Sequence, residues 1–443
     1  MPKSNLDLAH FRNTIAQVNP LSITGRVVQV VGLTVETMGL NCQIGEICEI
    51  QTGNRSSLIA EAIGFRNNRM LLMPLGSMEG IQPDSVVRSV SQVFKAPVGR
   101  SLIGRVLNGL GEPIDGKGPL KISSRASINQ TPPHHLQRSA IGEPLVTGVR
   151  VIDGMLTCGK GQRMGIFAGS GVGKSTLLGS IARNSESDIA VIALIGERGR
   201  EVREFLERDL GPEGLARSVI IVSTSDQPAL MRLKAASVAM TIAEYFRDEG
   251  MDVMFMMDSV TRFAMAQREI GLSIGEPPAS KGYTPSVFAM LPRLLERAGK
   301  GETGSITGFF TVLVEGDDFN EPICDAVRGI LDGHIILSRT LAARNHYPAI
   351  DVLNSVSRVM PALTTKEHLQ LAAFARKNLA VFEKFRDLVN IGAYVKGSDP
   401  EADTALLVMP EINRFLQQGV SDVSSFSNTL QSLAEISRVS SMN

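Results

Sequence analysis

The strongest constraint on the fold is one stretch in which an apolar run, a glycine-rich loop and a helical pattern follow one another. The run MGIFA covers 164–168, the loop reads AGSGVGKST over 168–176, and the helical run LLGSIARN comes next. Glycines allow successive backbone N–H groups to face a phosphate, and the N-terminus of the following helix adds a favourable dipole. The stretch therefore matches a phosphate-binding loop in its expected strand–loop–helix context.

The loop begins with Ala168 where the common pattern has glycine, but its GVGKST part is intact. A glycine-rich turn with an exposed lysine is the alternative, and the flanking strand and helix argue against it. Lys174 is expected to reach the β- and γ-phosphates of a nucleotide, and the Ser175 hydroxyl to hold Mg²⁺. The predicted nucleotide contacts in this loop are Gly169, Ser170, Gly171, Val172, Gly173, Lys174, Ser175 and Thr176.

Four more apolar runs have the pattern of strands that are buried on both faces of a sheet. They cover 188–195, 218–222, 252–258 and 306–315, and helical segments lie between them. One of these helices is expected to begin at Pro228, with Asp226 as its capping residue. A parallel sheet covered by helices is the simplest architecture for this part of the chain.

The pattern changes on both sides of this α/β part. Short alternating runs over 22–93, separated by turn residues, indicate a small all-β domain, a barrel. After about Pro361 the chain reads as amphipathic helices without strands, and an N-terminal amphipathic helix either packs on its own domain or binds a partner. The predicted divisions are 1–20 for the N-terminal helix, 21–95 for the barrel, 96–360 for the nucleotide-binding domain, which starts with a turn-rich connection at 104–120, and 361–443 for the helical domain.

Composition excludes several classes of function. The 45 Lys and Arg residues balance 45 Asp and Glu residues, so no net field favours nucleic acid or anionic membranes. The four cysteines and the histidines, among them His134 and His135, show no metal-ligand spacing, which fits a reducing cytosol. Because no apolar run approaches the roughly 20 residues of a membrane helix, and the first residues do not resemble a signal peptide, a cytoplasmic protein is expected.

Two carboxylates follow buried strands and are candidates for the chemistry at the loop. Asp258 closes the run DVMFMMD, which places it at the sheet edge where ligands bind, as a metal-side carboxylate. Alone, such an Asp is more often a helix cap. Glu197 lies just past the run 188–195 and is expected to orient and polarise the attacking water, with Arg198 as an ion-pair or positioning residue.

At this point the chain resembles the nucleotide-binding subunits of rotary ATPases. The segments GERGREV (196–202), DSVTRF and the run that follows it to 299, and PAIDVLNSVSR (348–358) carry the resemblance, and the last is similar to the signature shared by the α and β subunits. The resemblance covers essentially the whole chain. It implies a multidomain fold with an N-terminal β-barrel, a central RecA-like P-loop ATPase domain and a C-terminal helical domain. Within this family the chain most resembles the type III protein-export ATPases. The sequence of residues 325–339 is more similar to flagellar members than to virulence-associated ones.

The resemblance also implies roles for residues that the pattern alone leaves open. Tyr347 would stack on adenine, although a half-buried structural aromatic is as common. Arg358 would be an arginine finger acting on the nucleotide of a neighbouring subunit, and the acidic loop 315–322 would face the channel of a ring. The implied cofactors are ATP and Mg²⁺. The implied partners are further copies in a homohexamer, a stator-like regulator on the N-terminal helix, a coiled-coil central stalk protein, export substrates and chaperones, and a membrane export gate reached through partners at the cytoplasmic face of the inner membrane.

Several functions remain open beside ATP-driven flagellar protein export. The injectisome ATPase of a virulence secretion system is the nearest alternative, followed by a non-hydrolysing ring subunit, a rotary ATP synthase subunit and an RNA-translocating ring ATPase. Non-catalytic α-type subunits lack a glutamate at the place of Glu197, which favours catalysis. The mixed charge of 22–93 and the neutral chain argue against an RNA motor. The C-terminal helices lack the acidic stretch expected of a synthase β subunit.

Overall fold

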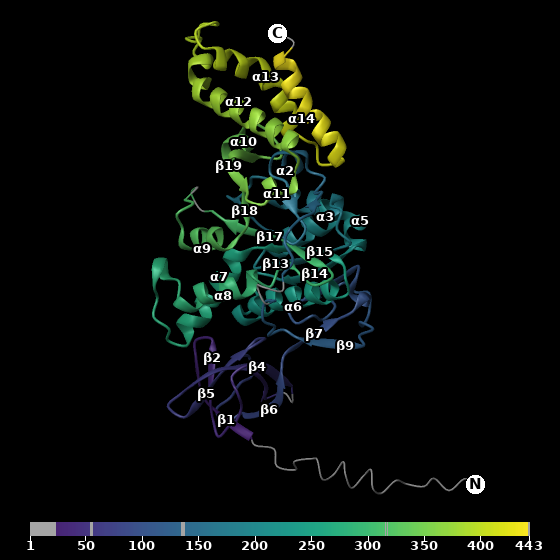
Figure 1. The fold of residues 1–443 in the computed structure, drawn as a ribbon. Coiled ribbons are helices and arrows are strands. Elements are labelled where there is room, and N and C mark those ends of the chain that lie inside the picture. Colours follow the sequence, from purple (N-terminus) through teal and green to yellow (C-terminus); the bar gives the residue numbers. More distant parts are fainter. Residues whose placement is uncertain (1–23, 54–55, 134–137, 315, 317, 442–443) are drawn as a thin grey trace, which may run out of the picture. The chain divides into compact units, whose positions relative to one another are not determined.

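The computed structural model describes residues 24–441 except 54–55, 134–137, 315 and 317. It divides into two compact units, Met1–Phe94 and Lys95–Asn443 (Figure 1). The helix predicted within 1–20 lies outside the described residues, as does the His134 and His135 pair. None of the described helices is long and apolar enough to cross a membrane.

The first unit is a closed barrel of six antiparallel strands in the order β1-β2-β5-β4-β3-β6. Its interior is filled by small and branched side chains such as Val35, Ile50 and Leu72, all fully buried. Asn67 and Asn68, with φ of 50° and 59°, form the tight turn between two of the strands. The barrel predicted from the alternating runs is therefore confirmed. The strands are β1 (Thr24–Val31), β2 (Thr34–Met38), β3 (Glu46–Gln51), β4 (Ser57–Arg66), β5 (Arg69–Pro74) and β6 (Val86–Val93).

The second unit is built on a sheet with the strand order β19-β18-β12-β17-β15-β13-β14-β8. All neighbours on this path pair in parallel except β18 and β19, which are antiparallel. The α/β class and the buried strands predicted from the apolar runs are confirmed. The strands are β8 (Arg105–Asn108), β12 (Arg163–Ala168), β13 (Ile189–Ile195), β14 (Ser218–Ser223), β15 (Asp252–Asp258), β17 (Ser305–Leu313), β18 (Gly333–Leu337) and β19 (Ile350–Ser357), with β16 (Gly299–Lys300) beside β17.

Two local predictions in this unit were wrong. The segment 104–120 was expected to be only a connection, but its residues Arg105–Asn108 form the edge strand β8 and pair with β14. Four residues in a glycine-rich setting give too short a pattern to read as a strand. The long helix α6 begins at Ala229, with Pro228 as the N-cap residue outside it. Proline suits this position because it has no N–H group to leave unpaired.

Helices cover the sheet, and the hydrophobic core between them continues into a helical C-terminal part. Buried side chains form one continuous cluster from the strands, such as Met164 and Ile192, to the last helices, such as Ile412 and Ile436. The division predicted at 360 and 361 stays a prediction, because these parts form one compact unit. The principal helices are α2 (Arg150–Met155), α3 (Lys174–Asn184), α4 (Gly199–Glu204), α6 (Ala229–Asp248), α7 (Val260–Ser273), α8 (Pro285–Leu295), α9 (Pro322–Ile330), α10 (Arg339–Ala343), α12 (Lys366–Asn390), α13 (Pro400–Leu416) and α14 (Phe426–Ser441).

A buried ion pair fixes α6 against the segment after α8. The Arg297 guanidinium donates to both carboxylate oxygens of Glu244, at 2.8 and 2.6 Å, and to the Ile128 carbonyl at 3.1 Å. The side chains of Arg297 and Glu244 are only 4% and 3% exposed. Neither charge can be left alone at this depth without a large desolvation cost.

We expect Arg297→Met to lower the free energy of unfolding by about 3–5 kcal/mol, because it leaves the Glu244 carboxylate buried without its cation. The double variant Arg297→Met with Glu244→Leu should recover most of this loss. Denaturant unfolding of the two variants and the parent protein measures both effects. Equal stability of the single and the double variant would contradict the argument.

Candidate functional site

The glycine-rich loop runs from the end of β12 to the first turn of α3. Gly173 is the N-cap residue of α3 and has a left-handed conformation, with φ of 87°, which glycine adopts without strain. A Cβ on Gly169 would lie 2.5 Å from the guanidinium Nε of Arg339, so a larger residue there would require the Arg339 side chain to move. The first N–H groups of α3 have no partner within the helix, so they are available to an anion bound at the loop.

Lys174, the first residue of α3, is the centre of an ion cluster. Its Nζ lies 2.5 Å from Asp258 Oδ1 and 3.5 Å from Glu197 Oε1. Thr311 of β17 also donates to Asp258 Oδ1, at 2.7 Å. All three charged side chains are at least 86% buried.

The sheet explains why residues so far apart in sequence meet. Strands β12, β13 and β15 run parallel, so the residues that follow them emerge at the same edge. Lys174 comes from the loop after β12, Glu197 from the segment after β13, and Asp258 from the last position of β15. The sequence analysis placed all three at this edge, and the structure brings them together.

Burial and charge set the protonation of this cluster. Burial raises the pKa of Glu197 to about 7, the Asp258 carboxylate adds to the rise, and Lys174 opposes it. Burial lowers the pKa of Lys174, but Asp258 and Glu197 more than offset this, so its pKa is raised overall and the ammonium form persists. The Glu197 side chain faces Glu201, and this hydrogen bond holds the pKa of Glu201 below its usual value. Glu197 is therefore a carboxyl group that exchanges its proton near neutral pH.

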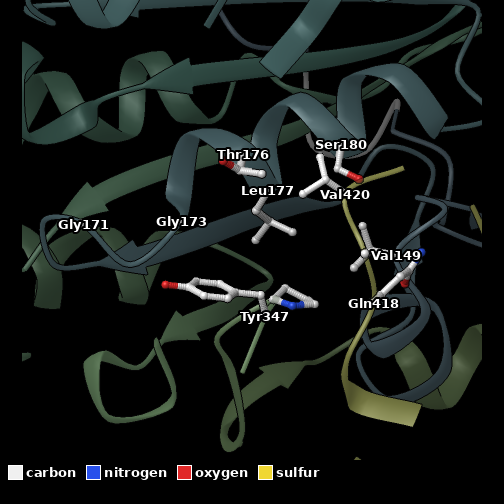
Figure 2. A pocket seen from close by; sticks show the side chains of 11 residues that line it. Val149, Gly171, Gly173, Thr176, Leu177, Ser180, Tyr347, Gln418 and Val420 are labelled. Carbon is white, nitrogen blue, oxygen red and sulfur yellow. The ribbon is translucent and has the colours of Figure 1, made fainter. Parts of the chain in front are cut away.

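A cavity of about 390 Å³ lies beside the loop. Figure 2 shows Tyr347 on one side of the cavity and Thr176, Leu177 and Ser180 of α3 on the opposite side, with Val420 near α3 and Val149 and Gln418 next to each other. A Cβ on Gly173 would lie 3.4 Å from the Tyr347 ring, so this ring stands directly beside the loop. The full lining is Val149, Gly171, Gly173, Thr176, Leu177, Ser180, Tyr347, Pro348, Gln418, Gly419 and Val420.

This cavity contains residues that the sequence analysis missed. Tyr347 was expected here, but Val149 and the segment 418–420 were not, because they lie far from the loop in sequence.

Arg262 was also missed by the sequence analysis. It contacts Gly196, where an added Cβ would lie 2.8 Å from the Arg262 Cβ, and its buried Nε has no hydrogen-bond partner among the described residues. The available signal in the sequence was its position four residues after Asp258, in the first turn of the helix that follows β15.

Two predicted residues do not join the cluster. The Arg198 side chain is 79% exposed and lies 3.8 Å from Glu201, because α4 begins at Gly199 and turns the chain away from the sheet edge. Arg358 is exposed and follows the last residue of β19, the antiparallel edge strand.

The direction of β19 separates Arg358 from the loop. Ser357 pairs with Gly333, which pairs with Met164 at the beginning of β12, whereas the loop follows Ala168 at its end. Met164 and Ala168 are four residues apart in β12, roughly 13 Å along the strand. Arg358 therefore lies toward one end of the strands, and the phosphate-binding loop of the same chain lies at the other end.

Oxygen groups suited to Mg²⁺ occur at the loop. Asp258 supplies a buried carboxylate, and Ser175 follows Lys174 in the first turn of α3. Hard oxygen donors of this kind, completed by phosphate oxygens, are what Mg²⁺ prefers. The described residues therefore fit the ion, whereas no group of three or more His, Cys, Asp or Glu side chains among them forms a separate metal site.

Comparison with known proteins identifies the three parts of the chain. Residues 148–357 match the nucleotide-binding domain of the ATP synthase alpha/beta family, residues 27–90 match its beta-barrel domain, and residues 364–435 match the T3SS EscN ATPase C-terminal domain. These matches follow the order predicted from the sequence.

Individual relatives agree with these matches over most of their length. The chain is 54% identical to a flagellum-specific ATP synthase of Bacillus subtilis, over 93% of this chain and 94% of the relative. It is 51% identical to a type 3 secretion system ATPase of Xanthomonas euvesicatoria, over 93% of each.

The fold is also that of a solved type III secretion ATPase. The structure of the assembled ATPase EscN from enteropathogenic E. coli matches with a TM-score of 0.88 and 46% identity, over 93% of this chain and 99% of that one. A second structure shows EscN in complex with its central stalk EscO, with a TM-score of 0.87 and 45% identity, over the same shares of the two chains. The chain therefore belongs to the ATP synthase alpha/beta family, among the ATPases of flagellar and type III secretion systems, and the prediction of an ATPase is confirmed.

Proposed function

We propose that this protein uses ATP hydrolysis to energise type III export of flagellar components, by releasing export substrates from chaperones and unfolding them at the export gate. The observation that carries the chemical part is the buried cluster in which Lys174 touches both Asp258 and Glu197, beside the cavity at Tyr347. Injectisome export is the second candidate, because relatives of both kinds match at similar identity.

The cluster is arranged for phosphoryl transfer to water. The phosphates of ATP would replace the two carboxylates as partners of Lys174, while the N–H groups of 169–174 would hold their oxygens. Tyr347 would stack on the adenine. Mg²⁺, held by Ser175 and Asp258, would neutralise charge on the phosphates. Little covalent chemistry is needed, so position and charge supply most of the acceleration.

Glu197 would then act on the attacking water. Its carboxylate can accept a hydrogen bond from the water and orient it toward the γ-phosphate, and it can take the proton that the water loses. Arg198 would act only as a positioning residue, because its ion pair holds Glu201, which faces Glu197. Arg262, beside Gly196, adds positive charge next to the same segment.

Arg358 would complete the site of a neighbouring subunit. Its place toward the far edge of the sheet keeps it from its own loop, whereas a head-to-tail ring of copies could bring it to the next one. Such a cation meets charge that develops in the transition state. The solved structures of EscN, assembled and in complex with its central stalk EscO, support the proposal of a homohexamer around a coiled-coil stalk here.

The remaining partners also follow from the family. We propose that residues 1–20 bind a stator-like regulator, that chaperones and substrates dock on the ring, and that partners hold the ring at the cytoplasmic face of the inner membrane, beside the export gate. The loop 315–322 would face the channel, and nucleic acid is not among the expected ligands. A pull-down from native cells tests these partners, and recovery of injectisome components without flagellar ones would favour the second candidate.

The first prediction separates binding from chemistry. We expect Glu197→Gln to keep ATP binding and to lower turnover by at least roughly 100-fold, because an amide cannot take the proton of water. Lys174→Ala should instead weaken ATP binding by at least about tenfold, since it removes a charge-assisted contact to phosphate. ATP titration and phosphate release measure both effects. Glu204→Gln, which changes an exposed carboxylate on α4, is the control, and normal turnover of Glu197→Gln would remove Glu197 from the mechanism.

The second prediction concerns pH. Because the pKa of Glu197 is raised to about 7 and the carboxylate is the active form, kcat/KM for ATP should rise as pH increases through about 7. Below this pH the carboxyl group is protonated and cannot accept the proton of water. Steady-state rates between about pH 5.5 and 8.5 measure the profile, because each pH unit changes the ratio of protonated to deprotonated Glu197 about tenfold. A profile that is flat across neutral pH would contradict the assignment.

The third prediction tests whether Arg358 acts between subunits. Rings that mix Arg358→Ala with Lys174→Ala subunits should regain activity, up to about a quarter of the parent rate in an equal mixture, because some interfaces then join an intact loop to an intact arginine. Each variant alone should be nearly inactive. Mixtures of Lys174→Ala with Glu197→Gln are the control, because every site in them keeps one defect. No recovery, with subunit exchange verified, would show that Arg358 does not act in trans.

A further inference from the structure

The wall of the cavity that faces Tyr347 comes from the far end of the chain. The segment 418–420 follows α13 and passes close to Val149, the residue before α2 (Figure 2). More than 260 residues of sequence separate these two segments. Tertiary packing against the turn at 147–150 therefore brings this C-terminal segment to the cavity.

Gln418 makes that attachment. Its side-chain Oε1 accepts from the Arg150 N–H at 2.7 Å, and its Nε2 donates to the Gly148 carbonyl at 2.8 Å and to the Asp422 carbonyl at 2.8 Å. Its backbone N–H donates to the Tyr347 carbonyl at 3.0 Å. One residue thus joins the turn before α2, the loop after α13 and the aromatic side of the cavity.

The turn that receives Gln418 is held by hydrogen bonds of its own. Asp153, fully buried, accepts from the Thr147 N–H and hydroxyl, at 2.8 and 2.7 Å, and from the Gly148 N–H at 3.0 Å. The Arg150 guanidinium donates to the Phe415 carbonyl at the end of α13, at 2.9 Å. The position of segment 418–420 is therefore fixed against a frame that does not include the phosphate-binding loop.

We propose that Gln418 is a positioning residue for the nucleotide base, which holds the outer wall of the cavity against Val149 and Tyr347. This inference rests on the proposed function, in which Tyr347 stacks on the base. Both N–H groups and the oxygen of its side-chain amide are used by backbone partners, so Gln418 shapes the cavity and does not read the edge of the base. Its loss should weaken contacts to the base and spare contacts to the phosphates.

The test compares a ligand that has a base with one that lacks it. Calorimetric titration with ADP and with inorganic pyrophosphate, both in Mg²⁺, is made on the full chain and on Gln418→Leu. We expect the Kd for ADP to rise about tenfold and the Kd for pyrophosphate to stay unchanged, because leucine keeps none of the three side-chain hydrogen bonds that hold the cavity wall beside the base. In steady state, KM for ATP should rise by a similar factor while kcat stays unchanged.

Three further variants complete the test. Gln418→Glu, of nearly the same size, keeps the acceptor for Arg150 but opposes the Gly148 and Asp422 carbonyls, so it should show the same selective loss even if the leucine variant is unstable. Gln431→Leu makes the same change at an exposed glutamine of α14 and should bind both ligands normally. Tyr347→Ala should weaken ADP binding.

The outcomes separate the two ideas. A selective loss of ADP binding in both Gln418 variants supports the proposal. Equal weakening of ADP and pyrophosphate, or no change in either, overturns it. If Tyr347→Ala weakens ADP binding but the Gln418 variants do not, only the role of Gln418 fails. If Tyr347→Ala also leaves ADP binding unchanged, the assignment of this cavity to the base fails, and the role of Gln418 fails with it.

Discussion

The contact of Lys174 with two buried carboxylates is the interaction on which the site depends. One ammonium group and two carboxylates can be buried this close together only because each charge has a partner of opposite sign. The strands that carry them are fixed by the parallel sheet, so the charges cannot move apart to reach water. The cluster is therefore a preformed pair of anions around a cation, which the phosphates of a nucleotide can enter by exchange of partners.

The barrel and the helical part differ in whether they share a core with the sheet. The barrel has a core of its own, and the described residues of the cluster and of the cavity lining all belong to the second unit. The helices after 365 share the core of the sheet, and the loop after α13 supplies one wall of the cavity. Packing, and not only sequence order, thus connects the C-terminal helices to the nucleotide site.

The sequence predicted those features that are encoded locally. The strand, glycine loop and helix around Lys174 lie next to one another in the chain, and the buried runs that end near Glu197 and Asp258 needed only the rule that parallel strands share an edge. It could not predict β8, whose four residues pair with a strand more than a hundred positions away. Nor could it place Gln418, because its contacts depend on tertiary packing. Arg198 lies next to Glu197 in sequence, but the direction of its side chain depends on how α4 begins, which the sequence pattern did not show.

The reversed direction of β19 has a consequence for assembly. It puts the phosphate-binding loop and Arg358 toward opposite ends of the strands. If Arg358 acts between subunits as proposed, each subunit would have one face that receives an arginine and another that provides one. Under the proposed role of Arg358, an open row of subunits always contains one incomplete site, at its end. Closing the row into a ring removes that end and completes the last site. Full activity would then report that the ring has closed, and a cell would spend little ATP on subunits that have not yet assembled.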